Sequence, residues 1–414
     1  MSLLLNVSVG SFLLIFCSSA RGEGVSVFAG SLLGPGGVEV GVSFAGPVDK
    51  ASIPFPDNFQ LSGGSIGGLR FDEETGSVVL ETSGLQTGRG YTVTVSNVAD
   101  LSGNPVPATT LSFTVRPISW GPVGQSELGF APAAVAIGGS GFDLRNGGIQ
   151  FWDVYDEATF VYEAVTGDFD KKVRIESQDA SSPFARAGLM ARETLDLGKP
   201  RPANPDDPSQ AFSRYVAIQA DPVLTADGSP ANNQFEITRR LFTGGIGRLT
   251  PDPTESLPIS ENAAPAYPNA WVRLKRGGDT FSMYSSNNGK DWTLLGTTAF
   301  PTTDANGSPV PPFPKTVFVG PVYGSENGNI PLNSGLRADW LARFRDYGDA
   351  NSGGDPGESL AIERRADGLF VRWTGPGTLQ KSPSVFGPWG NVDGAASPYS
   401  VPPGQSAQYF RLKL

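Results

Sequence analysis

The chain contains no histidine in its 414 residues. Histidine is the base of Ser-His-Asp and Cys-His catalysis and the commonest ligand of zinc, so its absence excludes those chemistries. Any catalysis would have to come from carboxylates, lysine, tyrosine or a hard metal ion. No cofactor is expected.

Cysteine is almost absent as well, since Cys17 is the only one. It falls within residues 1–20, where an apolar run (residues 12–16) precedes the small residues Ser18, Ser19 and Ala20, as in a secretory signal. The usual positive start of such a signal is missing. We expect an exported protein, secreted or at the cell surface, whose mature chain has no disulfide and depends on its β cores alone.

Long apolar runs and an excess of positive charge are also missing. Outside residues 1–20 no segment approaches the roughly 18 consecutive apolar residues that a membrane span needs, so no span is expected. The formal charge of −10 argues against nucleic acid or an anionic membrane as a partner, because phosphate groups attract a basic surface.

Glycine and proline, by contrast, are abundant, with 53 and 35 residues. Such frequent turn residues suit many short strands, and no long stretch shows a sustained apolar period of 3.6 residues. The sequence therefore predicts an all-β fold, and its length suggests about three domains.

Residues 24–117 form the first predicted domain. Its strand-like runs are 38–44, 77–80, 91–95 and 111–115, separated by glycine-rich turns. The segment 88–95, followed by 97–100 and 103–105, resembles bacterial Ig-like repeats of extracellular proteins, and Phe44 fits an earlier strand of that family. Ala45 and Gly46 depart from the pattern. The resemblance implies an Ig-like sandwich that acts mostly as a spacer.

Residues 118–347 form the second and largest domain. Three ordered motifs stand out: Ala187–Glu193 (AGLMARE), Trp271–Arg276 (WVRLKR), and Tyr284–Trp292 (YSSNNGKDW) after a glycine turn. In this order they resemble the concanavalin A-like (jelly-roll) modules of secreted bacterial hydrolases and adhesins. The resemblance implies a β-sandwich that hosts either sugar-binding or sugar-cleaving proteins.

The end of the chain divides into a linker and a small module. Residues 348–357 are rich in Gly, Asn, Asp and Pro, as linkers are. Residues 358–414 resemble the small C-terminal β modules of large bacterial secreted proteins. About 57 residues without a disulfide or metal lie near the lower limit of independent stability.

Candidate ligand-binding residues lie in the second domain. Period-two alternation puts Trp271 and Arg273 on one strand face and Val272 and Leu274 on the other, which we expect to be buried. An aromatic ring beside a guanidinium is suited to stack on and hydrogen-bond a sugar. Trp152 and Tyr155, with Tyr162, form a second aromatic cluster that is a candidate rim of a sugar site. Burial in the core is the alternative for Trp271.

The acidic residues give little support to an enzyme. Glucanases of the resembled family use two carboxylates on one strand, typically in a Glu-x-Asp-x-Glu or Glu-x-Asp-x-x-Glu arrangement, and neither pattern occurs here. Asp153 and Asp156 are expected in a solvated loop. For Arg192 we expect a cross-strand ion pair such as that with Glu236, and a place on a binding face is the alternative. Asp168 and Asp170 are weak candidates for a structural calcium, which needs six to eight oxygens.

Three functions remain open from the sequence. The first is a secreted or surface multi-module protein that is not a catalyst and binds carbohydrate or another cell-surface polymer through the concanavalin A-like domain. The second is a glycoside hydrolase or lyase on the same sandwich. The third is a purely structural or adhesive scaffold.

Overall fold

The computed structural model describes most of the chain. The described residues are 5–7, 25–73, 75–125, 132–146, 148, 151–204, 207–222, 234–249, 264–304, 306–326, 340–350, 360–365, 368–373, 378–383, 388–402 and 408–413. Residues 24–350 form one compact unit, and residues 1–23 with 351–414 form a second.

The all-β prediction is confirmed. In the described part of the chain the regular structure consists of strands and two 3-10 turns, Lys50–Ser52 and Pro56–Asn58. The predicted runs 38–44, 77–80 and 91–95 fall within strands, as does most of 111–115.

The first sandwich lies between residues 25 and 115. Its strands are β2 (Ser26–Gly34), β3 (Gly37–Ala45), β4 (Phe59–Leu61), β5 (Ser65–Asp72), β6 (Ser77–Ser83), β7 (Gly90–Val95) and β8 (Thr109–Thr114). The order β2-β3-β6-β5 forms one layer and β4-β7-β8 the other. Alternating apolar residues such as Val40, Val42 and Val93 fill the core between the two layers.

The second sandwich contains the remaining strands of the larger unit. They are β9 (Ser119–Val123), β10 (Ala133–Ile137), β11 (Gly141–Asn146), β12 (Ala158–Thr166), β13 (Phe169–Gln178), β14 (Arg186–Arg192), β15 (Tyr215–Ala220), β16 (Phe235–Arg240), β17 (Arg248–Leu249), β18 (Ala270–Gly277), β19 (Thr280–Ser286), β20 (Thr293–Ala299), β21 (Thr316–Gly324) and β22 (Trp340–Asp349). One layer has the order β10-β11-β22-β13-β18-β19-β20, and the other runs β17-β16-β15-β14-β21-β12-β9. Fully buried residues including Leu189, Ile218, Val272 and Phe344 form the core between them.

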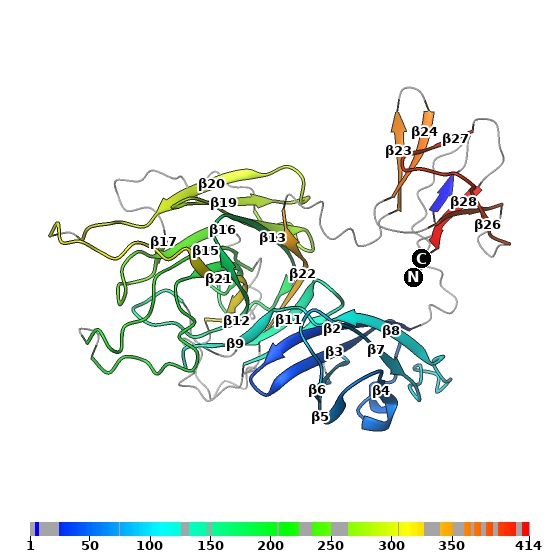
Figure 1. Ribbon diagram of the computed structural model, residues 1–414, viewed down its shortest axis with the longest axis horizontal. Helices are drawn as coiled ribbons and strands as arrows, with labels where there is room; N and C mark the ends of the chain where they lie inside the picture. Colours follow the sequence, from blue (N-terminus) through cyan, green and yellow to red (C-terminus); the bar gives the residue numbers. More distant parts are fainter. Residues whose placement is uncertain are drawn as a thin grey trace. The chain divides into compact units, whose positions relative to one another are not determined.

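The two sandwiches share one continuous sheet of eleven strands. Strand β9 pairs with β12 on one side and meets β2 on the other at Leu33 and Ser119, so the sheet passes from one core to the next (Figure 1). At Gly41 of β3 a Cβ would lie 2.2 Å from the carbonyl oxygen of Ala136, so β10 approaches β3 only because that side chain is absent. The predicted boundary at residues 117/118 therefore lies inside one compact unit, and the division into an Ig-like and a concanavalin A-like domain stays a prediction.

The second compact unit contains two small sheets. Strands β1 (Leu5–Val7), β28 (Gln408–Lys413), β25 (Thr378–Ser382) and β26 (Gly390–Asn391) form the first, and β23 (Leu360–Arg365), β24 (Gly368–Trp373) and β27 (Tyr399–Val401) form the second. Among the described residues of this unit, Val371, Leu379 and Phe410 form its buried apolar core.

Two sequence predictions lie largely outside the described residues. Apart from β1, the predicted signal at residues 1–20 is not described, and neither is most of the linker at 348–357. Within the described part, no helix has the length and apolar character needed to cross a membrane.

Candidate ligand-binding face

Strands β13, β18 and β19 bring the first pair of predicted residues onto one sheet face. Val272 and Leu274 are fully buried in the core, and Trp271 and Arg273 lie on the opposite face, half-buried, as the alternation predicted. In the strand register, Lys172 of β13 and Tyr284 of β19 lie opposite Arg273. Arg174 of β13 lies opposite Trp271. Local alternation and strand register together build this face.

Arg273 is fixed at the centre of the face by Asp170. Its Nε and Nη2 donate to the two carboxylate oxygens of Asp170, each at 2.6 Å. The guanidinium carbon lies 5.0 Å from the centre of the Tyr284 ring and 5.7 Å from that of Trp292. The hydrogen bonds that Arg273 donates to Asp170 raise the pKa of Arg273 above its usual value, so the guanidinium is a permanent, oriented cation.

The same contacts bear on the calcium candidates. Both oxygens of Asp170 accept from Arg273, and Asp168 accepts from the backbone N–H of Gly278 at 2.8 Å in the β18–β19 turn. Among the described residues no group of three or more acidic or cysteine side chains is placed to hold a metal ion. Asp170 thus holds the Arg273 side chain in place, and Asp168 stabilises the β18–β19 turn.

Trp271 is held between cations and a tight turn. Lys172 Nζ and the guanidinium carbon of Arg174 lie 5.7 and 5.9 Å from the centre of its ring. Gly289 has a φ of +69°, and a Cβ there would lie 2.7 Å from Cε2 of Trp271, so only glycine lets this turn rest on the indole. This contact explains the glycine in the Tyr284–Trp292 motif. We call the set Lys172, Arg174, Trp271, Arg273, Lys275, Tyr284 and Trp292 the aromatic–cation face.

Trp152 and Tyr155 lie elsewhere, on a loop that packs against the outer face of the eleven-stranded sheet. Tyr155 is buried, at 4% exposure, with the guanidinium carbon of Arg201 4.3 Å from the centre of its ring. Trp152 is half-buried, and the corresponding distance from Arg186 is 5.0 Å. Tyr162 packs with Phe160 and Phe318 in a separate apolar cluster. The structure thus divides the four predicted binding residues between two places.

Asp156 lies between those aromatics and the sheet, and the expectation of a solvated loop is wrong for it. Asp156, Arg192 and Arg240 have fully buried side chains. Arg240 donates to both oxygens of Asp156 at 2.8 Å, and Arg192 donates to one of them at 3.1 Å. Burial alone would lower the pKa of Arg240, but the charge of Asp156 raises it above its usual value. This cluster joins the loop to the sheet.

The expected partner of Arg192 is also wrong. Glu236 pairs with Arg186 at 3.2 Å, and the second partner of Arg192 is Asp196 at 2.7 Å. In the strand register Glu236 lies opposite Gln219, whereas Arg192 lies opposite Tyr215, four residues earlier on β15. The register between the strands therefore keeps Arg192 and Glu236 apart, and the local sequence pattern does not encode that register.

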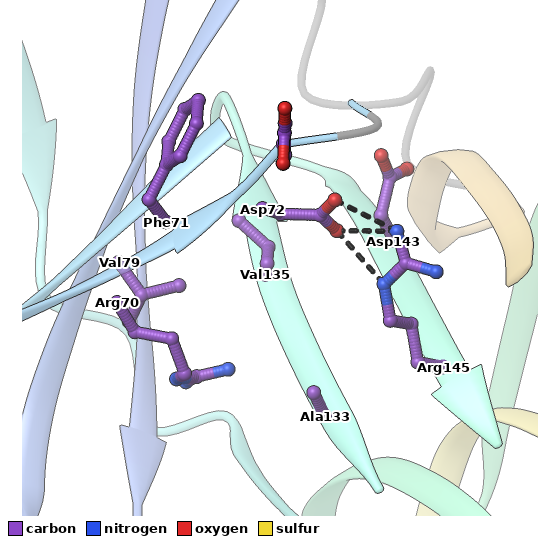
Figure 2. Close-up of a pocket in the computed structure, with 9 residues that line it drawn as sticks. Arg70, Phe71, Asp72, Val79, Ala133, Val135, Asp143 and Arg145 are labelled. Carbon is purple, nitrogen blue, oxygen red and sulfur yellow. Dashed lines mark hydrogen bonds and ion pairs between the residues drawn. The ribbon is translucent and has the colours of Figure 1, made fainter. Parts of the chain in front are cut away.

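A pocket of about 510 Å³ lies where the first sandwich meets β10 and β11. Apolar side chains such as Val79 and Val135 line one part of it, and Arg145 donates to both oxygens of Asp72 at 2.8 and 2.7 Å in another (Figure 2). Burial raises the pKa of Asp143, and the charge of Arg345 beside it opposes that shift. The strands that line this pocket are far apart in sequence, so no motif indicated it.

Comparison with known proteins gives only distant likenesses. No protein-family model matches the chain, and no curated protein sequence matches it. A functionally unknown protein from Saccharomyces cerevisiae is 14% identical over 56% of this chain and 95% of its own, with a TM-score of 0.33.

Two bacterial structures are similarly remote. A GH43 protein from Bacillus licheniformis is 11% identical over 75% of this chain and 51% of its own, with a TM-score of 0.32. The surface layer protein SbsC is 13% identical over 94% of this chain and 50% of its own, with a TM-score of 0.20. The chain thus spans about half the length of each, and likenesses this weak carry no activity or ligand to it.

Proposed function

We propose that this is a secreted or surface-displayed β protein that is not a catalyst and binds an acidic carbohydrate polymer through the aromatic–cation face. The observation that carries the proposal is the arrangement of Trp271, Tyr284 and Trp292 around the fixed guanidinium of Arg273. Aromatic rings offer apolar surface to sugar rings, and an oriented guanidinium offers two parallel donors to a carboxylate or sulfate.

The local charge favours an acidic polymer over a neutral one. On β13 and β18 the outward positions hold the cations Lys172, Arg174, Arg273 and Lys275 and the anions Asp170 and Glu176. On these two strands four cations stand beside two anions, in contrast with the formal charge of −10 for the whole chain. Arg174 is itself paired with Asp346 of β22 at 2.7 Å, so Lys172 and Lys275 carry the charge argument. Lys275 is exposed, and Lys172 lies beside the Trp271 ring, so both ammonium groups are within reach of a bound polymer.

Binding is favoured over hydrolysis by how the carboxylates are used. Glycoside hydrolysis typically needs two carboxyl groups free to act on the glycosidic bond. In this sandwich Asp156, Asp170, Glu193 and Glu236 are each bonded to an arginine. Carboxylates held in this way position side chains and stabilise the fold.

Titration of the full-length protein with an acidic and a neutral polysaccharide, followed by tryptophan fluorescence, tests the proposal. We expect the acidic polymer to bind and the affinity to fall with added salt, because exposed charges are screened. Trp271→Ala, and Lys172→Gln combined with Lys275→Gln, should each weaken binding about tenfold, which corresponds to about 1.4 kcal/mol. Lys50→Gln, a change at an exposed lysine of the first sandwich, is the matched control and should bind as the wild type does.

Two outcomes would count against this function. Absence of binding to every acidic polymer tried would favour a scaffold. Binding that the Trp271 and lysine variants leave unchanged would place the site elsewhere on the protein.

A further inference from the structure

A second group of polar residues lies buried on the outer face of the eleven-stranded sheet, away from the aromatic–cation face. Arg186, Gln219 and Glu236 are 4%, 0% and 1% exposed. Gln219 lies opposite Gly188 on β14 and opposite Glu236 on β16, and Arg186 is two residues from Gly188 on the same side of its strand. The strand register therefore places Arg186, Gln219 and Glu236 close together at one end of the adjacent strands β14, β15 and β16.

Two hydrogen-bond donors in this group have no acceptor within the described protein. Arg186 donates from Nε to Glu236 at 3.2 Å, but its Nη1 is buried without a partner. Gln219 accepts from Thr238 at 3.3 Å through Oε1, and its Nε2 is likewise buried without a partner. Buried donors are nearly always paired in folded proteins, so two unpaired donors on neighbouring strands indicate a place built to meet acceptors from outside the chain.

The other end of the same strands shows that this arrangement is not general. There, Arg240 donates from all three of its nitrogens to oxygens of Asp156, Asp153 and other residues. Arg192 similarly bonds Asp156, Asp196 and the carbonyl of Thr194. The guanidinium groups of Arg192 and Arg240 are thus held by several acceptors, whereas Nη1 of Arg186 has none.

Trp152 is the most exposed member of this group and gives it an apolar side. The guanidinium carbon of Arg186 lies 5.0 Å from the centre of the half-buried Trp152 ring. Phe184, two residues before Arg186, is 45% exposed. Glu326 is half-buried nearby and accepts from the Ser182 hydroxyl at 3.0 Å.

The charges around this group disfavour an anionic ligand. Arg186 supplies one positive charge, and Glu236 and Glu326 supply two carboxyl groups. Burial raises the pKa of Glu326, the charge of Arg186 and the bond from Ser182 oppose that shift, and the negative charge of Glu236 adds to it. A further negative charge would meet the same repulsion from these carboxyl groups.

From these contacts we infer that Arg186, Gln219, Glu236 and Trp152 form a second binding site, which takes a neutral, polyhydroxylated ligand such as one uncharged sugar residue. Sugar hydroxyls accept from Arg186 Nη1 and Gln219 Nε2 and donate to the glutamates, and the indole packs on the apolar face of the ring. This site does not depend on the proposed function, because it lies on a different sheet and selects the opposite class of sugar.

The experiment is a titration of the full-length protein with neutral methyl glycosides and with a uronic acid, monitored by calorimetry. We expect a neutral glycoside to bind and the uronic acid to bind at least tenfold more weakly. Gln219→Met keeps the shape of the side chain but removes both amide donors, and it should weaken glycoside binding at least tenfold. Trp152→Ala should do the same, whereas Lys50→Gln, at an exposed lysine of the first sandwich, should leave glycoside binding unchanged.

A second readout separates binding from folding. Gln219→Met removes the unpaired Nε2 donor together with Oε1, which accepts from Thr238, so its reference is Thr238→Val, which loses the same hydrogen bond. In the absence of sugar Gln219→Met should melt at or above the temperature of Thr238→Val. A melting temperature below that of Thr238→Val would show that the Nε2 donor is structural and would overturn the inference. So would the absence of binding by every neutral glycoside, or equal binding by wild type and Gln219→Met. Loss of acidic-polymer binding alone would overturn only the proposed function of the aromatic–cation face.

Discussion

Asp156 and Arg240 form a fully buried, bidentate ion pair in which Oδ1 and Oδ2 each accept from a separate guanidinium nitrogen at 2.8 Å. Arg192 adds a third bond to the same carboxylate. The pair joins the loop that carries Trp152 and Tyr155 to strands β14 and β16. The loop's position is therefore set by charge pairing as well as by apolar contact.

Removing the Asp156 charge should cost more stability than most single substitutions. In Asp156→Asn two buried guanidiniums lose their shared anion, and breaking a buried pair on one side typically costs about 3–5 kcal/mol. Urea unfolding followed by tryptophan fluorescence measures the loss. Asp153→Asn, in the same loop, is the control and should change stability by about 1 kcal/mol or less, because within the described part of the chain the Asp153 side chain bonds only the adjacent N–H of Val154.

Asp196 should make the protein lose stability in acid. Burial alone would raise its pKa, but the charge of Arg192 and the hydrogen bonds from Ser213 outweigh burial and hold the pKa below the usual 3.8. The folded state therefore binds this proton less readily than the unfolded chain does. Its contribution is complete above pH 3.8 and is lost as the pH falls toward the folded value.

Unfolding measured across the acid range should show this loss, and Asp196→Asn should flatten that part of the curve. Asp57→Asn, at an exposed aspartate of the first sandwich, is the control. An unchanged acid slope in Asp196→Asn would refute the assignment.

The ion pair between Asp72 and Arg145 should couple the two sandwiches. It is bidentate and mostly buried, and it links β5 to β11 across the pocket of Figure 2. A double-mutant cycle with Asp72→Asn and Arg145→Met should give a coupling energy of about 1–3 kcal/mol. The longer and more exposed pair of Arg70 and Glu39, at 3.4 Å, should give about 1 kcal/mol or less in a parallel cycle. Equal couplings would contradict this account.

Gly289 should be the more sensitive of two glycines in neighbouring turns. Gly289→Ala places a Cβ against the Trp271 ring in addition to straining a positive φ, so we expect a loss of about 2 kcal/mol or more. Gly278 also has a positive φ, of +61°, but a Cβ there meets nothing within 4 Å. Gly278→Ala should therefore cost only about 1 kcal/mol of backbone strain. Thermal unfolding of both variants makes the comparison, and a similar loss in each would argue against the contact with Trp271.

Part of the candidate face was predictable because it depends on local geometry. Side chains alternate along a strand, so Trp271 and Arg273 had to lie opposite Val272 and Leu274 once the segment was a strand. Their partners Asp170 and Tyr284 come from strands whose register is set by the whole sheet. The sequence identified the residue types on the face and left their contacts open.

Asp156 and Arg186 show where local patterns fail. A polar residue in an Asp-rich loop ordinarily predicts exposure, and the expectation failed because Arg192 and Arg240 come from distant strands to neutralise Asp156. Arg186, Gln219 and Glu236 occupy strand positions where polar side chains usually meet solvent, and they are buried on the outer face of the sheet instead.

The sequence by itself determined the all-β class, some of the strands, and which residues of those strands share a face, because turn chemistry and period-two alternation act over a few residues. It also fixed the absence of histidine chemistry. Only the tertiary structure decided that one sheet runs through both sandwiches, that Asp72, Asp156, Asp170 and Asp196 each pair with a particular arginine, and that Arg186 Nη1 and Gln219 Nε2 are buried without a partner. Those features depend on the register between strands distant in the chain, which is set by the packing of the whole core.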